Sequence, residues 1–147
     1  MQKNKSGFTL IELLVVVAII GLLSTLSILA LNSARARARD AKRVADVKQI
    51  QTALEMYYND TGNYPVTASV VAGSPIYSAN GTYIRAIPTP PTPVDGASCP
   101  ALQPNYTYVY TASTGAGGTY TINYCLGAGV NNIPGDALQT ATPAGIY

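Results

Sequence analysis

The chain has 147 residues, a formal charge of +2, two cysteines and no histidine. Lys3 and Lys5 precede the first apolar run, and the remaining basic and acidic residues balance, which argues against a general nucleic-acid-binding protein. The lack of histidine removes the commonest general base and metal ligand, so we expect neither an enzyme nor a cofactor-binding protein.

An uninterrupted apolar run extends from Phe8 to Leu31, and Glu12 is its single ionisable residue. As a helix this run would rise about 36 Å, enough to cross a hydrocarbon core of about 30 Å. The run is longer than the apolar core of a secretory signal peptide, and residues 29–34 form a poor cleavage site of the A-x-A type. The sequence therefore predicts a membrane-spanning helix that is not removed.

A specific motif marks the start of this run. A short basic leader ends at Gly7, and the letters GFTLIELL occupy residues 7–14. This stretch resembles the class III signal of type IV pilins and type II secretion pseudopilins at every position of its core. The resemblance implies cleavage between Gly7 and Phe8 by a prepilin peptidase, followed by N-methylation of the new Phe8 amine. It covers the N-terminal part of the chain, because later regions vary too much in the family to match by motif.

Glu12 is unexpected inside a membrane span, because transferring a carboxylate into lipid costs free energy unless the charge is paired. In the family that the motif resembles, this carboxylate is thought to pair with the N-terminal ammonium of a neighbouring subunit. The resemblance therefore implies an assembly contact between Glu12 of one copy and Phe8 of the next. The residues alone leave another reading open, in which Glu12 snorkels to the lipid headgroups and has no further role.

Beyond the span, the chain is predicted to continue as an amphipathic helix. Apolar residues recur at helical spacing at Val44, Val47, Ile50, Leu54 and Tyr57 or Tyr58. The helix should end near Tyr58, because residues 59–65 (NDTGNYP) supply a glycine cap and a proline stop. This passage also resembles the G-x-Y-P segment that follows the long helix in many pseudopilins.

Five basic residues follow the span, namely Arg35, Arg37, Arg39, Lys42 and Arg43. Taken alone, the positive-inside rule would place this cluster in the cytoplasm, whereas the N-terminal motif implies that the leader is cytoplasmic and the head lies outside. We favour the motif. The cluster contains no aromatic residue, so we interpret it as a solvated or lipid-facing surface that also neighbours Asp40 and Asp46. Subunit pairing or nucleic-acid binding are the alternatives.

After Pro65 the composition shifts to small, polar and tyrosine residues. Ile87–Pro93 (IPTPPTP) is predicted to be an extended connector. Tyr106–Thr111 and Thr119–Leu126 alternate with period two and should form an antiparallel hairpin, and Val66–Ile84 could supply a further short strand. The face of the second hairpin strand that carries Tyr120, Ile122, Tyr124 and Leu126 would pack on the apolar face of the helix.

The predicted fold class is therefore α+β, with a long N-terminal α-helix packed on a small antiparallel sheet, as in type IV pilins. The expected domain plan is a leader at 1–7, a membrane-spanning and polymerisation helix at 8–31, an amphipathic helix at 32–59 and a β-rich head at 60–147.

Cys99 and Cys125 lie in the head without CxxC spacing, and no histidine is present to complete a zinc site. In an exported head we expect a disulfide between them, which would resemble the disulfide-closed C-terminal region of many pilins. Two unpaired buried thiols are the alternative. Asp95 and Asp136 are the only acidic residues after Asp60, too few to indicate a calcium site.

The predicted function is that of a structural prepilin subunit, polymerised through its N-terminal helix into an extracellular type IV pilus-like filament. The resemblance implies as partners further copies of the chain, a prepilin peptidase, an assembly platform protein, an assembly ATPase and, before assembly, membrane lipid. The precursor would span the cytoplasmic membrane once with its head outside, and the product would be a cell-surface pilus.

Two alternatives remain at this stage. The chain could be the major pseudopilin of a type II secretion system, which builds a periplasmic pseudopilus that drives protein export. From another class, it could be a monomeric membrane-anchored binding module, for which Glu12 would have no purpose.

Overall fold

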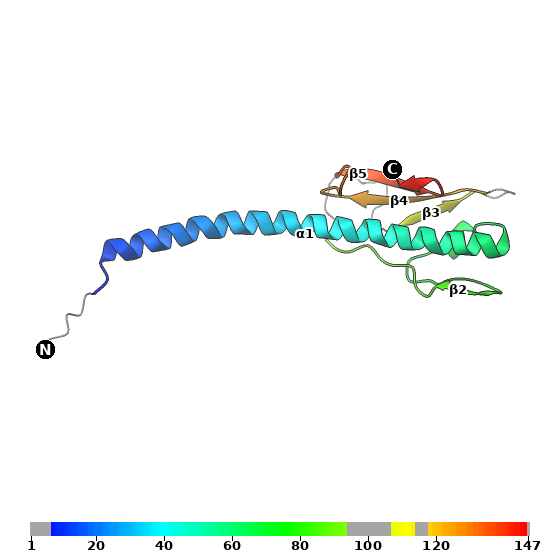
Figure 1. The fold of residues 1–147 in the computed structure, drawn as a ribbon, viewed down its shortest axis with the longest axis horizontal. Coiled ribbons are helices and arrows are strands. Elements are labelled where there is room, and N and C mark those ends of the chain that lie inside the picture. Colours follow the sequence, from blue (N-terminus) through cyan, green and yellow to red (C-terminus); the bar gives the residue numbers. More distant parts are fainter. Residues whose placement is uncertain (1–6, 94–106, 114–117, 147) are drawn as a thin grey trace. The chain divides into compact units, whose positions relative to one another are not determined.

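A computed structural model describes residues 7–93, 107–113 and 118–146 of the chain. These residues form a long helix, α1 (Leu10–Thr61), a short 3₁₀-helix, η1 (Thr67–Ser69), and two antiparallel β-sheets (Figure 1). The backbone divides into two compact units, residues 1–35 and 36–147, which are described in turn. The predicted α+β fold class, a long N-terminal helix with small antiparallel sheets, is confirmed.

Helix α1 runs without a break through Gly21 and the polar residues that follow it. Thr25 and Ser27 satisfy their hydroxyls within the helix by donating to the carbonyls of Leu22 and Leu23, each at 2.8 Å. Polar residues are therefore accommodated in the apolar run without loss of helical hydrogen bonds.

The C-terminus of α1 has the predicted glycine cap. Gly62 adopts a φ of 74°, and its N–H donates to the carbonyl of Tyr58 at 2.8 Å. A left-handed residue at this position satisfies a helix-terminal carbonyl at little cost only when it is glycine. The helix nevertheless continues to Thr61, beyond the predicted end near Tyr58, because the glycine and not the tyrosine pair determines where it stops.

Six short strands are described in the second unit. They are β1 (Ile76–Ser78), β2 (Gly81–Ile84), β3 (Val109–Ala112), β4 (Tyr120–Leu126), β5 (Ala137–Thr142) and β6 (Gly145–Ile146). The first two form a hairpin, and the other four form a sheet in chain order. The predicted hairpin is confirmed as β3 and β4, with Tyr110 opposite Ile122. The region 66–84 holds two strands instead of one, and the sequence patterns did not predict β5 and β6.

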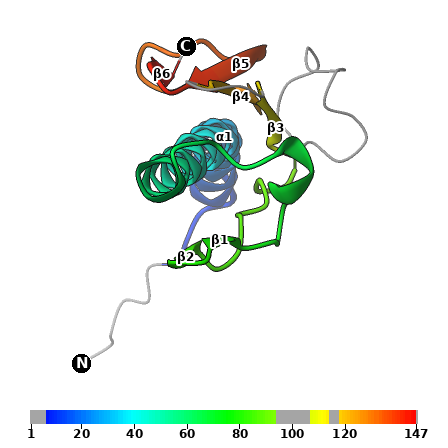
Figure 2. The same ribbon diagram turned by 90° about the vertical axis from the view of Figure 1, so that its right-hand side faces the viewer.

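The second half of α1 lies between the two sheets. The four-stranded sheet covers one side of the helix and the β1–β2 hairpin lies on the other (Figure 2). The predicted helical face is buried, with Val47, Ile50 and Leu54 at most 1% exposed. The predicted face of β4 is buried as well, because Tyr120, Ile122, Tyr124 and Leu126 are each at most 1% exposed. The amphipathic pattern of each element therefore placed the core correctly.

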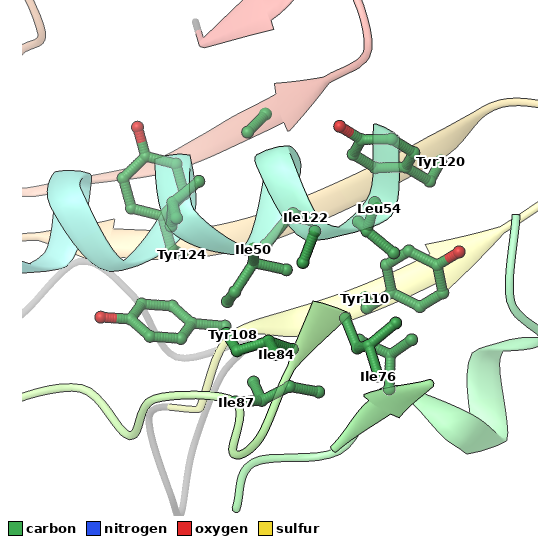
Figure 3. Packing of buried hydrophobic residues seen from close by; sticks show 14 of the residues in the cluster. Ile50, Leu54, Ile76, Ile84, Ile87, Tyr108, Tyr110, Tyr120, Ile122 and Tyr124 are labelled. Atoms are coloured by element: carbon green, nitrogen blue, oxygen red, sulfur yellow. The ribbon is translucent and has the colours of Figure 1, made fainter. Parts of the chain in front are cut away.

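Tyrosines make up much of this core (Figure 3). Most of their hydroxyls have partners: Tyr108 donates to Asp46 Oδ2 at 2.9 Å, and Tyr110 donates to the carbonyl of Pro65 at 2.8 Å. The hydroxyl of Tyr124 is buried without a hydrogen-bond partner among the described residues. Tyr110 and Tyr124 therefore lie in the same core, but only the hydroxyl of Tyr110 has a hydrogen-bond partner among the described residues.

This difference gives a matched test. Tyr124→Phe is expected to leave the free energy of unfolding of the head unchanged or to raise it by up to about 1 kcal/mol, because it removes an unsatisfied buried polar group. Tyr110→Phe is expected to lower it by about 1 kcal/mol, because the Pro65 carbonyl loses its donor. Thermal unfolding of the full chain in detergent micelles compares the two variants, and equal losses at both positions would contradict the assignment.

The buried tyrosines also predict alkaline sensitivity. Burial raises the pKa of Tyr124 from 10.0 to about 12, and burial together with the Glu55 carboxylate raises that of Tyr64 to about 12. Above pH 10 the unfolded chain releases these protons while the folded head retains them, so stability falls as the pH rises from 10 towards 12. In an alkaline titration, part of the tyrosinate absorbance should rise only in the unfolding transition; full tyrosinate absorbance before unfolding would contradict this.

Candidate functional site

Glu12 forms a capping box with Thr9 at the N-terminus of α1. The Thr9 N–H and the Thr9 hydroxyl both donate to Glu12 Oε2 at 2.8 Å, and the Glu12 N–H donates to Thr9 Oγ1 at 3.2 Å. The reciprocal bonds satisfy two helix-terminal N–H groups that would otherwise lack partners. Only Oε2 takes part, and no described residue donates to Oε1.

Thr9 is a residue of this site that the sequence analysis missed. The signal was present, because threonine followed three residues later by glutamate before an apolar run is the spacing of a capping box.

Thr9→Ala tests the cap. We expect it to destabilise the first turn of α1 by about 1 kcal/mol, the usual effect of losing a threonine N-cap. Amide hydrogen exchange of Leu10–Leu13 in the full chain in micelles should accelerate about fivefold. Thr25→Ala, which alters a threonine that bonds only within the helix interior, is the matched control for the first turn. Unchanged exchange in Thr9→Ala would contradict the capping role.

The residues of the predicted cleavage point precede α1. Gly7 and Phe8 lie outside regular structure, and Phe8 is 89% exposed. The leader residues before Gly7 lie outside the described residues. In the first unit, therefore, the predicted scissile bond is next to the capped helix start, and Glu12 lies within the first turn.

The apolar run itself is uncovered within its own unit. Its large side chains are about half or more exposed, as at Leu13, Ile20 and Leu29, and α1 contains a segment apolar and long enough to cross a membrane. Apolar surface of this extent is stabilised by lipid or by contact with other proteins.

The second unit contains a buried ion pair at the start of its helical segment. Asp40 is 0% exposed and Arg43, one helical turn later, is 2% exposed; the guanidinium Nη1 donates to Asp40 Oδ1. Arg43 Nη2 also donates to the carbonyls of Pro91 and Pro93, at 2.9 and 3.1 Å. This corrects the interpretation of the whole basic cluster as a solvated or lipid-facing surface: Arg43 is internal and holds the connector 87–93 against the helix.

The same carboxylate anchors the loop after β4. Backbone N–H groups of Gly127, Ala128 and Gly129 donate to Asp40 Oδ2 at 3.1, 2.6 and 3.0 Å. Successive amides around one anion form a concave nest that compensates a buried charge. Asp40 and Arg43 therefore join three segments distant in sequence, and we call this arrangement the head lock.

Of the two cysteines of the predicted disulfide, Cys125 lies within the described residues. Cys125 is 7% exposed on β4, whereas Cys99 and Asp95 lie outside the described residues. The disulfide between Cys99 and Cys125 stays a prediction. Among the described residues, no group of three or more histidine, cysteine, aspartate or glutamate side chains is placed to hold a metal ion.

Residues 2–28 match the family model described as the prokaryotic N-terminal methylation motif. The chain is 35% identical over 101 residues to the type II secretion system core protein G of Aeromonas hydrophila, covering 62% of this chain and 71% of that protein. It is 37% identical over 100 residues to the protein of the same name in Klebsiella pneumoniae, with coverages of 62% and 71%.

A further relative is the type IV major pilin protein PilE1 of Neisseria gonorrhoeae. It is 30% identical over 87 residues, which is 59% of this chain and 41% of the pilin. No solved structure is significantly similar to the chain. Members of this family are structural subunits that assemble into pseudopilus or pilus filaments. The methylation motif, the apolar helix and these relatives together show that the chain belongs to the type IV pilin and type II secretion pseudopilin family, as a prepilin-type structural subunit.

Proposed function

We propose that the chain is cut between Gly7 and Phe8, methylated at the Phe8 amine, and polymerised through its N-terminal helix into a pseudopilus of a type II secretion system. The observation that carries this proposal is the GFTLIELL motif at the start of an exposed apolar run, Phe8–Leu31, whose single ionisable residue is Glu12. The peptidase, platform protein and ATPase that such a pathway requires are part of the proposal.

The position of the cleavage point supports processing. Gly7 has no side chain, and among the described residues none except its chain neighbour lies within 4 Å of a Cβ built on it. The residues that follow lie outside regular structure until Leu10 begins α1. A protease needs an accessible backbone outside regular structure, and here it would find one directly before the helix. The capping box uses the N–H of Thr9, which cleavage before Phe8 leaves intact.

The geometry of Glu12 supports pairing between copies. The capping box occupies Oε2 and orients the carboxylate, while Oε1 accepts no hydrogen bond from the described residues. The ammonium of Phe8 in a neighbouring copy is a suitable donor for Oε1, and both desolvation costs fall when the two charges meet. Such a contact joins two different surfaces of neighbouring copies, and it propagates as an open helical filament when the rotation between copies does not close a ring.

The relatives favour secretion over a surface pilus. The core protein G relatives from Aeromonas and Klebsiella are each covered over 71% of their length, against 41% for the pilin. The G-x-Y-P passage after α1 points in the same direction. A type IV pilus is the second candidate, favoured by the similarity to PilE1.

Deletion of the gene separates the two candidates. A pseudopilin should be required for export of folded proteins, so exoproteins would accumulate in the periplasm of the deletion strain and return to the medium on complementation. Normal export together with loss of surface filaments would instead identify a pilus subunit. A strain that retains both would contradict filament assembly itself.

A further inference from the structure

A groove lies between the start of the helical segment of the second unit and the loop after β4. Its volume is about 660 Å³. Its helical wall consists of Arg37, Ala38 and Ala41, and its loop wall includes the apolar residues Val130, Ile133 and Pro134.

The loop wall is rigidly held. Asp40 binds the backbone amides of residues 127–129, and the backbones of Val130 and Ile133 bond to each other at 3.0 and 2.9 Å. Gly129 has a φ of 79° and packs so closely on Gly135 that a Cβ at Gly129 would lie 2.6 Å from the Gly135 nitrogen. The head lock and the close packing of Gly129 on Gly135 therefore fix the loop that forms this wall of the groove.

The lining combines one positive charge with apolar surface. Arg37 is exposed and is the only ionisable residue of the lining. No described residue forms a hydrogen bond or ion pair with its guanidinium. Beside it, Val130 and Ile133 are only half-buried. A ligand that fits this chemistry carries an anionic group next to an apolar portion.

The position of Arg37 in the sequence indicates where such a ligand is found. Leu31 is the last residue of the apolar run, and the six residues from there to Arg37 rise about 9 Å along a helix. This rise is comparable with the polar layer of about 5–8 Å on each side of the hydrocarbon core. A basic side chain only six residues beyond a membrane-spanning run is close enough along the chain to meet the phosphates of the lipid headgroups.

We propose that this groove binds the headgroup of an anionic phospholipid, with the phosphate on Arg37 and the glycerol and first methylene groups on Val130, Ile133 and Pro134. Guanidinium groups bind phosphate oxygens in a bidentate manner, and apolar side chains favour the methylene groups. The inference goes beyond filament assembly, because it concerns the subunit before it leaves the membrane.

The test uses the full chain, isotope-labelled, in neutral detergent micelles. Phosphatidylglycerol is titrated in, and phosphatidylcholine with the same acyl chains is the lipid control. We expect phosphatidylglycerol alone to shift the amide resonances of Arg37 and of the residues other than proline in the range 128–135. Arg37→Gln should weaken this binding about fivefold, the contribution of one basic residue at an anionic surface. Arg37→Lys should retain part of the affinity, and Arg85→Gln, at an exposed arginine outside the groove, should bind as the unmodified chain does.

Three results would overturn the proposal. Equal shifts with both lipids would show that the charge is not recognised, and unchanged affinity in Arg37→Gln would show that the groove is not the site. Equal binding of glycerol 3-phosphate, which has no acyl chain, would assign a site for soluble anions instead of lipid. None of these results depends on whether the chain forms filaments.

Discussion

Glu12→Gln is expected to remove the protein from sheared or periplasmic filaments while leaving it processed and present in the membrane. Glutamine can still accept hydrogen bonds from Thr9, so the start of α1 is preserved. It cannot form an ion pair with the Phe8 ammonium of the next copy, and that ammonium would then enter an apolar environment without a counter-charge.

Fractionation and immunoblotting measure this effect, with filament-associated protein as a share of the total. Thr25→Val is the matched control, because it changes another polar residue of the span whose hydroxyl bonds only within its own helix. The control should assemble normally. If Glu12→Gln enters filaments as efficiently as the control, the carboxylate is not an assembly contact and the snorkelling reading takes its place.

Asp40→Asn is expected to destabilise the head by about 3 kcal/mol or more. The substitution keeps an oxygen for the amides of residues 127–129 but removes the carboxylate charge to which the buried Arg43 guanidinium donates. Breaking one partner of a buried ion pair typically costs about 3–5 kcal/mol, because an uncompensated charge remains inside the protein.

Denaturant unfolding of the full chain in micelles measures this loss. Lys42→Gln, at an exposed position between the two lock residues, should change stability by less than about 0.5 kcal/mol. Adding Arg43→Met to Asp40→Asn should cost less than the sum of the two single changes, because the buried charge is removed. Strict additivity, or an Asp40→Asn loss as small as that of Lys42→Gln, would contradict a coupled buried pair.

The sequence predicted those elements whose hydrophobic period and local stop signals agree. In α1, Val47, Ile50 and Leu54 recur at helical spacing, and Gly62 caps the end. In β4, large residues alternate, and their inward face is the one expected. In both elements, the large side chains whose spacing predicts the helix or the strand are also the side chains that fill the core.

Strand β5 could not be predicted in this way, because its pattern is inverted. Gln139 and Ala141 point into the head, whereas Leu138 is 42% exposed. The inward glutamine is satisfied by donating to the carbonyl of Pro134 at 3.0 Å, an interaction that depends on the loop conformation. Hydrophobic alternation therefore gives the wrong face for this strand.

The head lock could not be predicted from the sequence either. The spacing of Asp40 and Arg43 indicates a helical ion pair, but an exposed and a buried pair have the same spacing. Burial here depends on the loop at residues 127–129 and on the carbonyls of Pro91 and Pro93, which are distant in sequence. Only the folded structure brings these segments together. Thr9, in contrast, could have been recognised from its local spacing to Glu12.

The mature chain is proposed to begin at Phe8 and to assemble through that terminus. The most direct test is the intact mass of the protein isolated from filaments, with fragmentation of its N-terminal peptide. We expect a chain that begins at Phe8 and carries one methyl group on the Phe8 nitrogen. A filament subunit that retains residues 1–7, or one cut at another bond, would contradict it.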